Sequence, residues 1–307
     1  MPALLLLLLG LGAATPADAR PRLRAELGVT RTGEASARWL AMIRRRVPSE
    51  RYDSIAAIRR PLQPSELAWA ELIRSRIGRW EDEIPALARL FEPVAAPDRA
   101  LIVLGNRGGE DAFTHDSVTI GFDLAALQRV YGDAAAAENP ARIDRLFRHE
   151  YVHLLQKAWL GARPYPMDTP LAAAVAEIWA EGLGTYYSMS DRWRLREGRP
   201  SPAAAEALER LEPRFAERLA ALACAEPEAA RALTADLSYG AFDRKWGALP
   251  GALWLEAEAS RSGAALRSFV LEGPDAVWAL AARHLPGRLG DIVAAARAAG
   301  ARCEGPR

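Results

Sequence analysis

The strongest constraint on the fold is a hydrophobic pattern that is helical almost throughout and becomes strand-like only between Ala100 and Asp123. Within that stretch, "ALIVLG" is a short apolar run, and "DSVTIGFD" places Val118, Ile120 and Phe122 on one side, as in a half-buried strand. We predict that these two segments belong to one small sheet. With 307 residues, 50% of them hydrophobic, the chain can bury a sizeable core. The pattern therefore predicts an α+β fold that is predominantly helical.

Two well-delimited helices follow the predicted strands. "NPARIDRLFRHEYVHLLQKAWLG" begins with Asn139 as a candidate N-cap, and "TPLAAAVAEIWAEGLGTYYS" begins with Thr169 in the same role. Each candidate cap is followed by a proline, which suits the first turn of a helix. Further alanine-rich helices are expected up to the C-terminus, interrupted by an aromatic loop from Thr234 to Gly251.

The first of these helices carries two of the four histidines in the chain, in the sequence "HEYVH". Residues four apart on a helix face the same way, so His149 and His153 can present both imidazoles to one metal ion. Glu150 projects beside that point, where its carboxylate can take a proton from metal-bound water. This is the HExxH arrangement of zinc peptidases. Catalytic zinc needs a third protein ligand, and the following helix offers Glu177 and Glu181, four residues apart.

"HEYVH" followed by "WAEGLGTYY" resembles the gluzincins, zinc metallopeptidases whose third ligand is a glutamate on the next helix. The resemblance covers about His149 to Tyr187, and it implies a zincin-like fold in which Glu181 binds Zn²⁺ and Thr185 supports a histidine. The alternative, a thermolysin-like arrangement, makes Glu177 the ligand. Gly182 favours Glu181, since a glycine allows close approach of the helices. The Met-Glu-Asn motif of the aminopeptidases is absent from the chain, so exopeptidase action is not predicted.

The sequence offers candidates for several further elements of such a site. In this clan the substrate lies along an edge strand beside the zinc, and "DSVTIGFD" is the candidate strand. The second group that stabilises the oxyanion has four candidates: Tyr239, Tyr186, Tyr187 and His115. We call the aromatic loop from Thr234 to Gly251 the late loop. Two tryptophans in or close to it could line a substrate cleft: Trp246 and Trp254.

The N-terminus predicts export. Residues 3–14 form an apolar run followed by Ala17-Asp18-Ala19, which is typical of a signal peptide spanning residues 1–19. No other stretch is apolar enough to cross a membrane. The two cysteines, Cys224 and Cys303, either pair in this oxidising setting or remain two free thiols. Charge is nearly balanced, with 40 basic and 39 acidic side chains, so nothing indicates a nucleic-acid partner.

Together these features predict a periplasmic or secreted zinc metallopeptidase that acts on peptides or proteins. Residues 20–307 would form one catalytic domain, with an N-terminal αβ lobe at about 20–135 and a helical lobe at about 136–307. His149, His153 and Glu181 would bind Zn²⁺, and Glu150 would be the general base. A zinc hydrolase of a non-peptide or cell-wall bond is the first alternative, and a non-catalytic binding protein with a zincin fold is the second. The sequence leaves the oligomeric state open.

Overall fold

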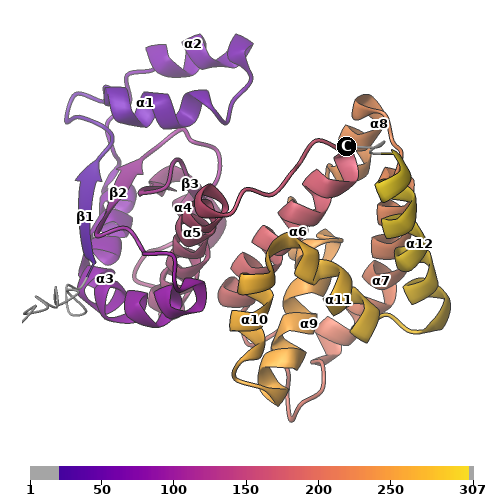
Figure 1. The fold of residues 1–307 in the computed structure, drawn as a ribbon. Coiled ribbons are helices and arrows are strands. Elements are labelled where there is room, and N and C mark those ends of the chain that lie inside the picture. The colour runs from indigo at the N-terminus through magenta and orange to yellow at the C-terminus, as the bar shows by residue number, and fades with distance from the viewer. Residues whose placement is uncertain (1–20, 304–307) are drawn as a thin grey trace, which may run out of the picture.

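A mixed four-stranded sheet organises the N-terminal half of the chain (Figure 1). The structure is a computed structural model that describes residues 21–303, so the predicted signal peptide lies outside the described residues. The strand order is β1-β2-β4-β3, with parallel pairing throughout except between β3 and β4. The strands are β1 (Arg22–Leu27), β2 (Arg99–Gly105), β3 (Ala112–Thr114) and β4 (Thr119–Asp123). Both predicted strands are therefore present in one sheet, and β1 and β3 were not predicted.

One expectation about the sheet is wrong. The segment "DSVTIGFD" was the candidate edge strand, but its core, β4, lies between β2 and β3. The sheet's edge strands are β1 and the three-residue β3, and β3 is the one that packs against the helix α5 (Asn139–Ala162). The strand β4 is buried at every position, which suits an internal strand and explains its apolar composition.

The two faces of the sheet are covered by different helices. Along β2, Ile102 and Leu104 point into the main core, whereas Val103 points into a smaller cluster with Trp39 of α1 (Ala37–Arg44). On the main-core face, Trp80 of α3 (Pro64–Ala88) stacks on Phe147 of α5 with ring centroids 4.2 Å apart. The stacked rings fix α3, α5 and the sheet as one packed unit.

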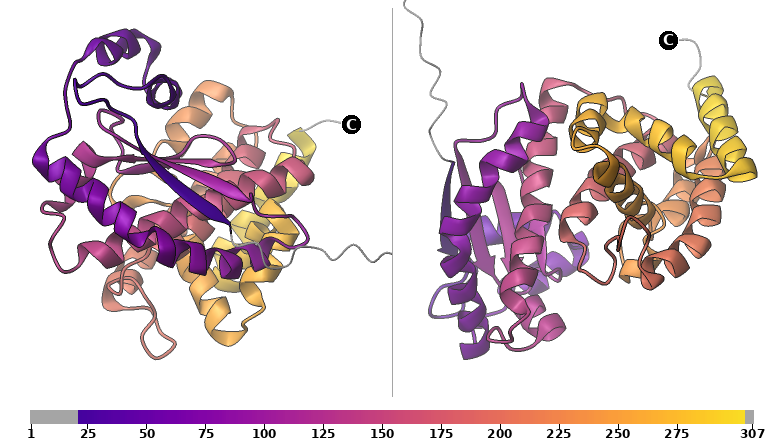
Figure 2. Two further views of the ribbon diagram at one scale, coloured as in Figure 1. Left: turned by 90° about the vertical axis from the view of Figure 1, so that its left-hand side faces the viewer. Right: turned by 90° about the horizontal axis from the view of Figure 1, so that it is seen from below.

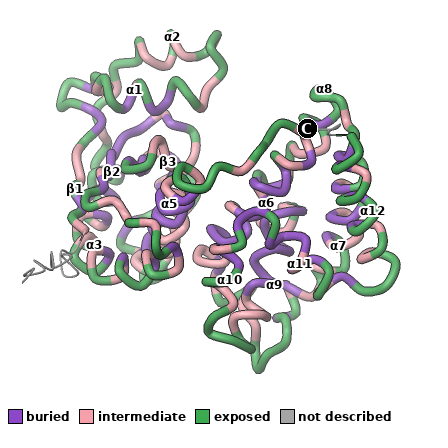
Figure 3. The backbone as a smooth tube through the Cα atoms, viewed as in Figure 1, coloured by how far each residue is buried: buried purple, intermediate pink, exposed green. Residues whose placement is uncertain are grey.

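The C-terminal half is a helical lobe that packs around α6 (Pro170–Ser188) (Figures 1 and 2). Figure 3 shows the buried positions running along the inner faces of these helices. The fold is therefore α+β and predominantly helical, as predicted. The remaining helices are α2 (Ser49–Ala57), α4 (Leu124–Tyr131), α7 (Pro202–Leu222), α8 (Pro227–Thr234), α9 (Ala248–Arg261), α10 (Ala265–Glu272), α11 (Ala276–His284) and α12 (Gly287–Cys303).

Helix α5 joins the two halves. It packs on the sheet and on α3, and it also makes an extensive contact with α6. Residues 163–169 connect α5 to α6 (Figure 1). The Thr169 side chain caps α6 as predicted, but Asn139 is the first residue of α5 and does not cap it. The Asn139 amide instead donates to the Asp133 carbonyl at 2.7 Å, which anchors the start of α5.

A disulfide between Cys224 and Cys303 ties the end of α7 to the end of α12. We call it the C-terminal disulfide. Its Cα atoms are 5.9 Å apart, within the usual range for a disulfide, so the alternative of two free thiols does not apply. Within residues 21–303, none of the helices combines the length and the apolar composition that a membrane span needs.

Candidate metal centre

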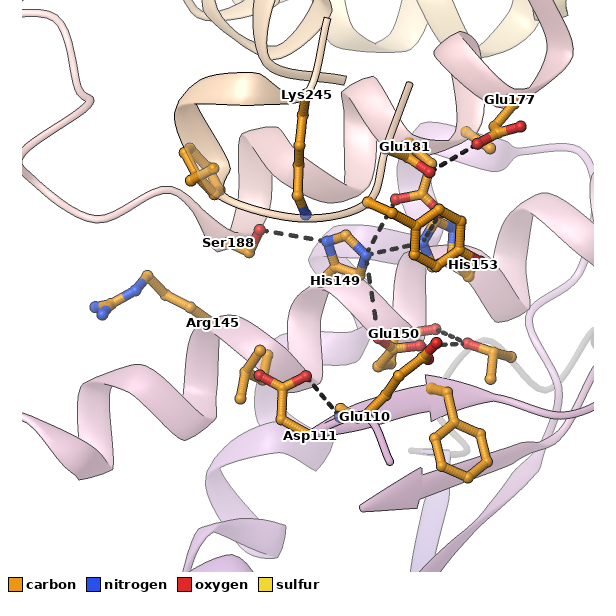
Figure 4. A pocket seen from close by; sticks show the side chains of 18 of the residues that line it. Glu110, Asp111, Arg145, His149, Glu150, His153, Glu177, Glu181, Ser188 and Lys245 are labelled. Atoms are coloured by element: carbon orange, nitrogen blue, oxygen red, sulfur yellow. Dashed lines mark hydrogen bonds and ion pairs between the residues drawn. The ribbon is translucent and has the colours of Figure 1, made fainter. Parts of the chain in front are cut away.

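The structure brings His149, His153 and Glu181 together (Figure 4). The two histidine Nε2 atoms are 3.0 Å apart, and the Glu181 carboxylate oxygens lie 3.6 Å from the first and 3.5 Å from the second. Four tetrahedral zinc ligands at about 2.0–2.1 Å from the ion are separated by about 3.4 Å. The side chains thus stand at the spacing that a shared zinc ion requires.

The hydrogen bonds around the histidines leave both Nε2 atoms as acceptors. Gln156 donates to the Ala180 carbonyl at 3.1 Å, and its amide oxygen lies 2.8 Å from His153 Nδ1, which must therefore carry the proton. The Ser188 hydroxyl donates to the Thr185 carbonyl, so its oxygen accepts from His149 Nδ1 at 3.3 Å. Two lone pairs then face each other beside a carboxylate. A cation between them would relieve this repulsion.

Helix geometry and tertiary packing contribute different parts of this arrangement. The four-residue spacing on α5 aligns the imidazoles, as the sequence predicted. The close approach of α6 depends on Gly184, because a Cβ there would lie 2.9 Å from His149 Cε1. Gly182, the glycine named from the sequence, instead faces α9, where a Cβ added to it would lie 3.6 Å from the backbone of Gly251. A glycine of α6 does allow its close approach to the histidines, as expected, but that glycine is Gly184 and not Gly182.

The two glutamates of α6 have different surroundings. Burial raises the pKa of Glu181, but His153, His149, Lys245 and Arg46 together lower it more, so the pKa is lowered. Burial raises the pKa of Glu177, and the negative charge of Glu181 raises it further, against the hydrogen bond from Ser238. Glu177 accepts that bond at 2.7 Å and holds the late loop in place. The structure therefore groups Glu181, and not Glu177, with the histidines.

Glu150 lies next to the three grouped side chains and is almost completely buried. One of its carboxylate oxygens accepts a hydrogen bond from the Thr114 hydroxyl at 2.7 Å. The other lies 4.0 Å from His149 Nε2 and is directed toward the same space as the histidine nitrogens (Figure 4). Thr114 belongs to β3, so the edge strand fixes the orientation of this carboxylate.

Thr185 does not have the role that the resemblance implied. Its hydroxyl is buried and has no hydrogen-bond partner within the described residues. Ser188, one turn nearer the helix end, is the hydroxyl that contacts His149. The physical reason is helical geometry: a turn separates the two residues, and only the later one reaches the Nδ1 side of the ring.

The three grouped side chains lie in a pocket of about 720 Å³ between the two halves of the molecule. Its aromatic lining includes Trp193 and Phe242, whose ring centroids are 5.1 Å apart. The predicted wall residues, Trp246 and Trp254, are instead buried in the core of the helical lobe, where both pack on Phe215. Their apolar surface is fully used in that packing.

The structure also separates the four candidates for the oxyanion-stabilising group. Of these, only Tyr239 lines the pocket, and it is 59% exposed at the rim. Tyr186, Tyr187 and His115 are not part of the lining. Sequence reasoning missed Lys245, whose amine extends from the late loop toward His149 (Figure 4). The only sequence signal for this role is that Lys245 is the single lysine in an aromatic loop.

Comparison of this chain with protein-family models, with curated proteins and with solved structures found no match.

Proposed function

We propose that this protein is an exported zinc-dependent metallopeptidase of the gluzincin type that hydrolyses peptide bonds. One observation carries the proposal: two histidine nitrogens and a carboxylate share one point, with a second carboxylate directed at the same space. The donor set of two imidazoles and one carboxylate is a common catalytic zinc site and leaves a coordination position open. The pocket above it is large enough for several residues of a peptide.

The zinc ion, when bound, supplies Lewis acidity for the peptide carbonyl and for a water molecule. Glu150 then acts as the general base and afterwards hands the proton to the leaving amine. Its position suits this role, since the Thr114 hydroxyl occupies one carboxylate oxygen and leaves the other free for the proton. His149 and His153 are held by Ser188 and Gln156 in the tautomer that binds a metal.

The edge strand β3 provides a surface for the peptide. A peptide in the extended conformation can add to the free side of this strand through main-chain hydrogen bonds. Because Thr114 lies on β3 and donates to Glu150, the same strand positions the substrate and the base. We propose that Lys245 stabilises the negative charge that develops on the carbonyl oxygen, since it is a cationic donor directed toward His149 (Figure 4).

The experiment is digestion of a mixed peptide library by wild-type protein and by Glu150→Gln, with zinc content measured on both. The substitution keeps the shape of the side chain and its acceptor for Thr114, so zinc should remain bound. Cleavage should fall by about 100-fold or more. Glu212→Gln is the control, because Glu212 is a partly buried glutamate bonded to Trp254, away from the pocket. Equal cleavage by wild type and Glu150→Gln would contradict the proposed role of Glu150, whereas cleavage of no peptide by the zinc-loaded wild type would refute the function.

The same library tests the two groups considered for the oxyanion. Lys245→Met should lower kcat with little change in bound zinc, whereas Tyr239→Phe should leave kcat close to wild type. A large loss of kcat in Tyr239→Phe together with an active Lys245→Met would reassign the role to Tyr239.

A further inference from the structure

Acidic and basic side chains line the pocket in equal number, but the two groups differ in how many members have an interaction partner. Five acidic and five basic residues line it: Glu110, Asp111, Glu150, Glu177 and Glu181, and Arg46, Arg142, Arg145, Lys157 and Lys245. The acidic residues all have partners. Arg46 pairs with Glu110, the Tyr131 hydroxyl donates to Asp111, and the three other carboxylates contact Thr114, Ser238 or the histidines. The formal charges of the lining therefore cancel, and a bound divalent cation would leave an excess of positive charge.

Among the described residues, the basic lining residues without a hydrogen bond or ion pair are Lys245, whose amine lies over the Phe242 ring at 5.7 Å, and Arg145. Within residues 21–303 its guanidinium makes no hydrogen bond and no ion pair, although it is only partly exposed. Its neighbour Arg142 differs, since it donates to the Asn139 side chain and lies over the Tyr131 ring at 4.5 Å. Burial, and then the positive charge of Arg142, lower the pKa of Arg145, while the charge of Asp191 opposes this without forming an ion pair. A half-buried guanidinium without an anion is costly, and an arriving carboxylate would offset the cost.

The position of Arg145 relates it to the proposed metal centre. It lies four residues before His149 on α5, so both side chains emerge on the same face of the helix. Four helical residues rise about 6 Å. Arg145 lines the pocket, and Figure 4 shows its side chain extending away from His149. An extended peptide advances about 3.3 Å per residue, so a group that reaches Arg145 lies roughly two or three residues from the scissile bond.

We propose that Arg145 is the specificity-determining residue of this pocket and binds a carboxylate of the peptide substrate two or three residues to one side of the scissile bond. The proposal rests on the proposed peptidase function and adds the substrate class. A planar guanidinium with free donors binds a carboxylate in a bidentate manner, which gives direction as well as charge. The carboxylate is either an Asp or Glu side chain or the C-terminal carboxylate of the peptide.

The test uses two versions of one randomised peptide library, one with free C-termini and one with C-terminal amides, digested by the zinc-loaded protein. Mass spectrometry of the products gives the residues around each cleavage site. Enrichment of Asp and Glu at one position in both versions identifies a side-chain carboxylate. Cleavage that depends on a free C-terminus identifies the terminal carboxylate. Efficient cleavage of both versions with no preference for an acidic group would overturn the proposal while leaving the peptidase function intact.

Variants assign the preference to Arg145. For the best acidic peptide found, Arg145→Gln should lower kcat/KM by about 10- to 100-fold, with a much smaller effect on the matched peptide in which the acidic group is neutral. Arg145→Glu should shift the preference to a basic residue at the same position, a readout that a damaged fold cannot produce. Arg142→Gln is the matched control, since it removes one positive charge from the same helix and the same pocket. Equal losses in Arg142→Gln and Arg145→Gln, for acidic and neutral peptides alike, would refute the assignment.

Discussion

The two glycines of α6 that face different neighbours give a sharp test of the proposed metal centre. Gly184→Ala adds a methyl group whose carbon would lie 2.9 Å from His149 Cε1 and 3.0 Å from His149 Nδ1. Gly182→Ala adds the same methyl group two residues earlier, where the nearest atoms belong to Gly251 at 3.6 Å. Non-bonded carbon atoms prefer about 3.5–4.0 Å, so only the first change creates an overlap.

The size of the effect follows from that overlap. Relief of it displaces the His149 ring by about 0.6 Å, whereas metal–ligand distances tolerate only about 0.2 Å. We expect Gly184→Ala to weaken zinc binding about 10- to 100-fold, as disruption of a ligand's orientation usually does. Gly182→Ala should bind zinc as tightly as wild type, and its higher helix propensity should stabilise the protein by up to about 1 kcal/mol.

The assay is competition for zinc with a chelator of known affinity, together with thermal unfolding of the metal-free proteins. The metal-free Gly184→Ala protein should still fold, because overpacking at one position costs only about 1–3 kcal/mol. Zinc binding as tight as that of wild type in both variants would refute the placement of His149 as a ligand held against Gly184. A similar loss of zinc in both variants would show that α6 as a whole, and not His149, is sensitive to substitution.

Three further outcomes are expected. Glu181→Ala should lose most bound zinc and Glu177→Ala should retain it, which metal analysis measures; the reverse order would move the ligand to Glu177. Asp144→Asn should lower the free energy of unfolding by about 2 kcal/mol at neutral pH. Burial raises the pKa of Asp144, but the hydrogen bonds from Arg76 and Trp80 and the charges of Arg76 and Arg79 together lower it more. A lowered folded-state pKa stabilises the fold above the usual pKa of 3.8, and this stabilisation is lost as the pH falls through the folded-state pKa. In urea unfolding, the difference in stability between wild type and Asp144→Asn should therefore shrink in acid. A difference that stays constant with pH would contradict this prediction. Reduction of the C-terminal disulfide, which spans 79 residues, should cost about 4 kcal/mol in the same assay, and an unchanged midpoint would count against this.

Local rules account for the parts of the site that were predictable before any fold was known. Helical periodicity placed His149 and His153 on one face, and a threonine-proline start defined α6. These features depend on residues a few positions apart, whose geometry is set by the backbone. The strand β2 was predictable for the same reason, since its apolar run is long enough to be recognised. The strand β1 alternates charged and apolar residues next to the predicted signal peptide and was overlooked.

Long-range packing selects the partners that meet from distant parts of the chain. The choice between Glu181 and Glu177 depends on how α6 lies against α5, and that in turn depends on the contacts of Gly184 and Gly182. The edge strand β3 has three residues, too few for any periodicity to appear in sequence. Lys245 comes from a loop, and Arg145 is one of many arginines in the chain with a similar sequence context. Their place in the pocket therefore follows from tertiary contacts, which no local pattern encodes.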